Sequence, residues 1–169
     1  MELLPYEEFS ALRLKQFLPP DAEIGDFQCD RQVWQCEYHD DFGELTRFCF
    51  ADNPPTTLSG IDTELGEGAL PFEVGDAILR ALRLPVDTRA TRDELLAKFG
   101  KPDYCWRDDP TLPRAARNGK DTDFLRFDVG AEWPYKVAFT VRLSGGGLTR
   151  FWIARKDMLV DEENDDDGV

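Results

Sequence analysis

The chain of 169 residues is long enough to bury the core of one domain. Its 41% hydrophobic and 32% charged residues exclude a collagen, a disulfide-stapled miniprotein and a wholly disordered chain. A formal net charge of −14 disfavours binding to nucleic acids and to anionic membranes, because both carry charge of the same sign. The same charge favours encounter with a more basic protein.

Negative charge is unevenly distributed along the chain. Residues 1–60 hold twelve acidic and four basic side chains, and residues 161–169 hold six acidic side chains and no basic one. We expect the last segment to be a disordered acidic tail. The first residues lack the basic and apolar stretches of a signal peptide, and the four cysteines are widely spaced. These features predict reduced thiols and a cytoplasmic location.

The first third of the chain predicts a helix and a β-hairpin. Hydrophobic residues at helical spacing predict a helix over residues 5–18, which ends at Pro19. Beyond it, apolar and polar side chains alternate, as is typical of half-buried strands. The segments that follow predict, in order, a short strand at 27–29, a strand at 32–39, a turn at 40–43 and a partner strand at 44–51.

The middle of the chain predicts a loop and two short helices. Prolines and glycines over residues 52–72 indicate a loop or crossover. Apolar residues four apart predict a helix over 73–83. A second helix begins after Thr91, whose spacing to Glu94 is that of a capping box, and it ends at Gly100.

The last third predicts strands and completes the fold class. Alternation predicts strands at 103–107, 123–129, 135–143 and 148–155, with a long polar loop at 108–122. Short helices followed by antiparallel strands predict an α+β fold. In such a fold the helices pack on one face of an antiparallel sheet.

Two segments resemble each other, which predicts an internal duplication. Residues 43–50 and 146–153 share the pattern Gly-x-Leu-Thr-Arg-Phe, and each follows a predicted strand and turn. We infer two helix-plus-hairpin units, at about 1–52 and 88–156, joined by a connector at 53–87 within one domain over 1–160. The alternative is chance recurrence, because strands favour such residues.

The second half resembles a known family. A capped helix, the sequence Phe-Gly-Lys-Pro-Asp from Phe99 to Asp103 and a meander ending in Gly-Leu-Thr-Arg-Phe resemble the unit of β-lactamase-inhibitor-protein-like domains, over residues 88–156. The resemblance implies a scaffold that grips another protein and carries no catalytic residues. Proteins with this unit are exported, whereas the first residues of this sequence do not predict a signal peptide. A similar helix end and hairpin occur in some cytoplasmic immunity proteins that neutralise toxins.

No residue pattern predicts a catalytic centre, a metal site or a cofactor. His39 is the single histidine, and at the edge of the predicted turn we expect it to be solvated. Cys36 lies three residues away on a strand, which sends the two side chains to opposite faces and disfavours a zinc site. The glycines at 145–147 precede a strand, whereas a phosphate loop precedes a helix, so we expect a hairpin turn there.

The candidate partner-binding residues fall into two groups. Trp133 and Tyr135 lie in a predicted turn, where large aromatic side chains are candidate anchors. Alternatively, this turn folds over the edge of the core and buries both rings. The acidic residues of the first hairpin are the candidate electrostatic contacts: Glu37, Asp40, Asp41 and Glu44.

These observations favour a non-enzymatic binding protein, similar in role to an immunity protein or an inhibitor, that engages a more basic protein. Two alternatives stay open. One is an enzyme that uses carboxylates in a pocket, which requires a cleft and a buried carboxyl of raised pKa. The other is a structural or adaptor subunit whose sheet edge or hairpin mediates assembly.

Overall fold

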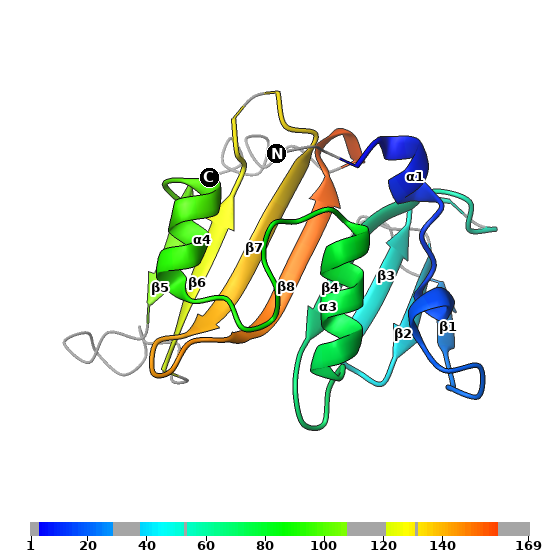
Figure 1. Ribbon diagram of the computed structural model, residues 1–169. Helices are drawn as coiled ribbons and strands as arrows, with labels where there is room; N and C mark the ends of the chain where they lie inside the picture. The colour runs from blue at the N-terminus through cyan, green and yellow to red at the C-terminus, as the bar shows by residue number, and fades with distance from the viewer. Residues whose placement is uncertain (1–3, 29–37, 53, 108–120, 131, 159–169) are drawn as a thin grey trace, which may run out of the picture.

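The computed structural model describes residues 4–28, 38–52, 54–107, 121–130 and 132–158. Within them the chain forms an eight-stranded antiparallel sheet with the strand order β1-β2-β3-β4-β8-β7-β6-β5. The helices lie on one face of this sheet, as Figure 1 shows for α3 and α4. The predicted α+β fold is therefore confirmed. The tail at 161–169 lies outside the described residues.

The first half of the chain begins with a broken helix. The predicted helix over 5–18 is wrong in one respect, because Arg13 has an extended backbone and separates two short helical turns. Its side chain donates to the carbonyl oxygens of Ser10 and Leu12, at 2.6 and 2.8 Å. The elements of this half are α1 (Tyr6–Ser10), the 3-10 helix η1 (Leu14–Phe17), β1 (Gly25–Gln28), β2 (Tyr38–Phe42), β3 (Thr46–Phe50) and β4 (Leu58–Glu64).

The predicted turn at 40–43 is wrong. Strand β2 continues through Phe42, and the chain turns at Gly43, where φ is +61° and a glycine is favoured. His39, expected to be solvated, is buried, lies within β2 and pairs with Cys49 of β3. Backbone pairing with β3 extends the strand beyond the point at which its polar residues suggest a turn.

The predicted loop over 52–72 contains a central strand. Strand β4 lies between β3 and β8 and is buried along most of its length. Gly60 allows the close approach of β8, since a Cβ atom there would lie 3.1 Å from the carbonyl oxygen of Ile153. The segment 52–72 has the composition of a loop because prolines and glycines lie on both sides of β4 and Gly60 lies within it.

The second half agrees closely with the sequence predictions. Thr91 caps α4 by accepting a hydrogen bond from the Glu94 amide at 3.2 Å, and Gly100 ends the helix at φ +84°. The predicted strand at 148–155 is confirmed at both ends. The elements of this half are α3 (Phe72–Ala81), α4 (Arg92–Phe99), β5 (Tyr104–Arg107), β6 (Thr122–Phe127), β7 (Tyr135–Arg142), β8 (Leu148–Arg155) and the 3-10 helix η3 (Lys156–Met158).

The helices and strands of the described residues follow the same order in both halves of the chain. Each half presents two short helices and then a four-stranded meander, and the two meanders meet where β4 pairs with β8. However, the matching segments at 43–50 and 146–153 fall on the third strand of one meander and the fourth of the other. The duplication stays a prediction, and the predicted connector at 53–87 contains β4 and α3.

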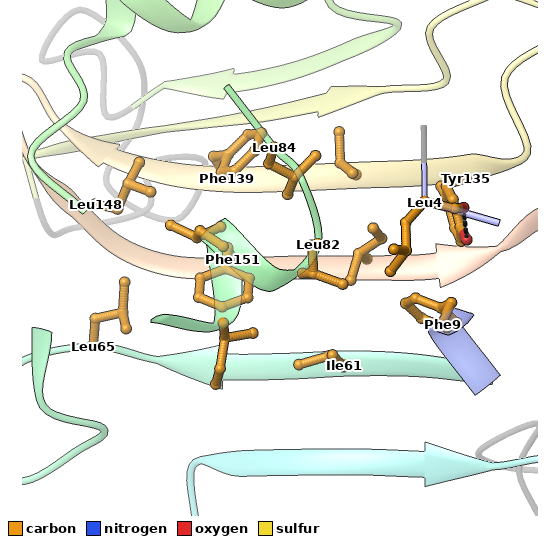
Figure 2. Close-up of a cluster of buried hydrophobic side chains, with 14 of the residues drawn as sticks. Leu4, Phe9, Ile61, Leu65, Leu82, Leu84, Tyr135, Phe139, Leu148 and Phe151 are labelled. Carbon is orange, nitrogen blue, oxygen red and sulfur yellow. Dashed lines mark hydrogen bonds between the residues drawn. The ribbon is translucent and has the colours of Figure 1, made fainter. Parts of the chain in front are cut away.

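A single core joins the two halves. Phe48, Ile61 and Phe139 from the sheet belong to the same buried cluster as Ile78 of α3 and Phe99 of α4. Figure 2 shows how this cluster continues from β4 across β8 to β7. At its upper end the N-terminal segment is fastened to β7, because the Tyr135 hydroxyl donates to the Leu4 carbonyl oxygen at 2.6 Å. None of the described helices is long and apolar enough to cross a membrane.

Candidate functional site

The sheet face opposite the helices carries side chains that the core does not use. Alternation along the strands sends every second residue to this face, and no described helix covers it. We call this the open face. Strand pairing aligns two rows of residues across it: Asp62, Trp152, Ala138, Arg126 and Tyr104 form one, and Glu64, Arg150, Thr140, Phe124 and Trp106 form the next.

Aromatic side chains gather at the β5 end of the open face. Tyr104 is 50% exposed and Trp106 is 43% exposed. Tyr104 packs edge-on against Phe124, with ring centroids 6.0 Å apart, and the Arg126 guanidinium lies 5.8 Å from the Tyr104 ring centre. Aromatic residues and arginine are enriched at protein–protein interfaces and in their energetic hot spots. The composition here is therefore that of a binding surface.

Charges on the open face are largely paired with one another. Arg150 donates to both carboxylate oxygens of Asp62, at 2.8 and 2.6 Å, and this hydrogen bonding raises the pKa of the guanidinium. Lys136 and Arg126 both lie within ion-pair distance of Asp128, at 3.9 and 3.8 Å. The described part of this face therefore carries little net charge, in contrast to the strongly acidic chain.

A hollow of about 480 Å³ opens at one end of this face. Its lining combines aromatic rings, threonine hydroxyls, guanidinium groups and carboxylates. A volume of this size is typical of small-molecule sites. The side chains that define it include Glu64, Trp106, Phe124, Thr140, Arg142 and Arg150.

The acidic residues predicted to contact a partner do not form one patch. Glu37 lies outside the described residues, and Glu44 is exposed in the β2–β3 turn. Asp41 faces the open side, where it accepts from His39 Nδ1 at 2.5 Å and lies 3.7 Å from Arg47 Nε. Asp40 faces the helix side, because neighbouring residues of a strand point in opposite directions.

Asp40 lies in a different electrostatic environment from Asp41. It pairs across the sheet edge with Asp26 of β1. Burial and the Asp26 carboxylate raise the pKa of Asp40, although the nearby Arg13 opposes the shift. Burial and a hydrogen bond to Asp26 also raise the pKa of Tyr38, to about 12. Asp40 does not line the hollow of about 480 Å³.

The two predicted aromatic anchors are core residues. Trp133 is 6% exposed and Tyr135 is 2% exposed, so the expectation that they contact a partner from the surface is wrong for this fold. Helix α1 covers Tyr135, with Phe9 5.0 Å and Tyr6 5.5 Å from its ring centre. The alternative reading, a turn folded over the edge of the core, is the one that the structure supports.

Sequence reasoning missed the aromatic residues of the open face. Phe124 and Trp152 are each next to a core residue on a predicted strand, and Trp106 lies on the predicted strand at 103–107. Large aromatic residues at strand positions that are expected to face solvent could have indicated this surface. This signal was ambiguous, because a strand buried on both faces has the same pattern.

A buried ion pair lies beneath α4, on the helix side of the sheet. Asp123 is fully buried and accepts from Arg92 Nε at 2.6 Å and from the Cys105 thiol at 3.1 Å. It does not line the hollow of about 480 Å³, and its contact with Arg92 of α4 assigns it a role in docking this helix. In the described part of the chain, no three His, Cys, Asp or Glu side chains come close enough to hold a metal ion.

Comparisons with known proteins give little further information. No family model and no curated protein matches the chain. A DUF4309 family protein (YjgB) from Bacillus subtilis is similar over 69% of this chain, with 15% identity and a TM-score of 0.33. The match covers 60% of that protein, which is less than two thirds of its length. The resemblance to β-lactamase-inhibitor-protein-like domains stays a prediction.

Proposed function

We propose that this protein is a non-enzymatic binding module, similar in role to an immunity protein or an inhibitor, that engages another protein through its open face. The exposed aromatic residues Tyr104 and Trp106 beside Arg126 are the observation that carries the proposal. Aromatic rings lose little conformational entropy on binding and bury a large apolar area, so they serve as anchors.

The partner is a more basic protein. The net charge of −14 attracts a basic partner over distances comparable to the Debye length, and so raises the rate of encounter. The contact surface itself has paired charges, as the core of an interface requires. Acidic residues around the sheet, such as Glu44, then lie at the rim of the proposed interface and attract the partner, whereas the open face forms the contact itself. We place this function in the cytoplasm, where the exposed thiol of Cys105 stays reduced.

The alternatives have weaker support. An enzyme that uses carboxylates requires a carboxyl of raised pKa in a cleft. The pKa of Asp40 is raised, but this residue does not line the hollow of about 480 Å³. An adaptor that assembles through a sheet edge requires an edge strand longer than the four residues of β1 or β5.

The test compares the open face with an exposed aromatic residue elsewhere. The wild-type protein is used to capture its partner from native lysate, and the partner is identified by mass spectrometry, purified and titrated. We expect the Tyr104→Ala/Trp106→Ala double variant to bind at least about tenfold more weakly. Phe72→Ala, on α3 and 40% exposed, should bind like the wild type. Equal affinity of the double variant and the wild type would overturn the proposal.

A further inference from the structure

Arg142 differs from the other basic residues of the open face. It is the last residue of β7, is exposed, and borders the hollow of about 480 Å³. Arg126, Lys136 and Arg150 each have a carboxylate within ion-pair distance, whereas none of the described side chains forms an ion pair with Arg142. Its guanidinium therefore has donors available for a ligand, and the residue borders both this hollow and a second one that Glu73 and Asp76 line.

The strand register places this guanidinium among neutral donors and flat rings. Arg142 pairs with Thr122, and Thr140, two residues earlier on the same face, pairs with Phe124. Phe124 pairs in turn with Trp106 on β5. With strands about 4.8 Å apart, Phe124 lies one strand from β7 and Trp106 lies two strands away, at about 10 Å, which is the length of a small aromatic acid.

The remaining charges fix the orientation of a ligand. Asp62 already holds Arg150 in a two-point hydrogen bond, so this guanidinium is rigid but partly neutralised. Two carboxylates also line the hollow and repel an anion from their sides: Glu64 lies beyond Arg150 on β4, and Asp121 precedes Thr122, the strand partner of Arg142. An anionic group is therefore most favourable near Arg142, with its apolar body toward Trp106 and Phe124.

We infer that this hollow binds a small organic anion, specifically a carboxylate carried on an aromatic ring. The carboxylate receives charge-assisted hydrogen bonds from Arg142, and the ring packs against Trp106 and Phe124. This inference does not depend on the proposed protein partner. The hollow exists in the free chain, and a small acid is measured without any partner present.

The experiment titrates the full chain with 3-phenylpropionate and follows the tryptophan indole signals by NMR. We expect saturable binding with a Kd on the order of 1 mM, because so small a ligand makes few contacts. The neutral amide, 3-phenylpropionamide, tests the charge, and butyrate tests the ring. Both should bind at least about tenfold more weakly than the acid.

Two variants and a control locate the site. Arg142→Gln should weaken 3-phenylpropionate binding at least about tenfold, and Arg142→Lys should retain part of the affinity, because it keeps the charge without the planar fork. Arg89→Gln removes an exposed arginine that lies outside the hollow and should change nothing. The inference is overturned if acid and amide bind equally, if Arg142→Gln binds like the wild type, or if no saturation occurs by about 10 mM.

Discussion

Asp40 and Asp41 are neighbours in the chain but face different sides of the sheet. Asp41 is held by His39 and Arg47 on the open face, whereas Asp40 lies beside Asp26 on the helix side. We therefore expect these two aspartates to have opposite effects on stability at pH 7. The difference arises from strand pairing and from the charge of each neighbour. It cannot be inferred from residue type, because both residues are aspartates.

Replacement of Asp40 tests this difference through pH. Because burial and Asp26 raise its pKa in the folded state, ionised Asp40 destabilises the fold once the pH exceeds its ordinary value of 3.8. We expect Asp40→Asn to increase the free energy of unfolding at pH 7, by less than about 1 kcal/mol because the site is partly solvated. The gain should disappear as the pH falls below the ordinary value, where Asp40 is protonated in both states.

Asp41→Asn is the matched control. It removes the charge that pairs with His39 and Arg47, so at pH 7 it should lower the free energy of unfolding by a similar amount. Urea denaturation of both variants between pH 3 and pH 7 measures the two effects. A stability loss in Asp40→Asn at pH 7 would contradict the environment described for Asp40.

At the scale of elements, α3 is attached to the sheet through a residue with no side chain. Gly75 lies on the buried face of α3, and a Cβ atom there would lie 2.6 Å from Leu65 Cδ2 and 3.1 Å from Thr88 Cγ2. Both neighbours are themselves buried, so neither side chain can move away freely. The glycine sets how closely the helix approaches the end of β4.

Gly75→Ala should therefore destabilise the protein although alanine favours helices. Helix propensity predicts a gain of about 1 kcal/mol, and overpacking predicts a loss of about 1–3 kcal/mol. We expect a net loss of stability in thermal and urea unfolding. Leu65→Ala in the Gly75→Ala background makes room for the new methyl group, so the double variant should be more stable than the two single losses added together. Strict additivity would show that the two residues do not contact each other in solution.

At the scale of the molecule, the two meanders share one core and one sheet. Buried residues from both halves belong to a single cluster, and β4 pairs with β8 over five residue pairs. No boundary in the described structure separates two cores. The two halves should then unfold together, as one cooperative unit.

Matched core substitutions test this cooperativity. Phe48 of β3 and Phe139 of β7 occupy corresponding strands of the two meanders, and both are buried. Replacement of either by alanine should cost about 3–5 kcal/mol. Hydrogen exchange of peptides from β3 and from β7 should accelerate by the same free energy in both variants. Acceleration confined to the half that carries the substitution would indicate two independently folding units.

Local patterns determined much of the second half of the chain. The cap at Thr91, the stop at Gly100 and the alternation over 148–155 depend on residues close together in sequence, and each was predicted and found. The backbone geometry of a cap or a strand is a short-range property, so these features can be read from the chain itself.

Tertiary structure decided the central strand and the site. Strand β4 is central because β8, about 90 residues later in the chain, pairs with the side of it that β3 leaves open. Tyr135 is buried because α1, about 130 residues earlier in the chain, packs on it. Burial depends on which segment covers a side chain. Trp106 stays exposed because it lies on the sheet face that no described helix covers.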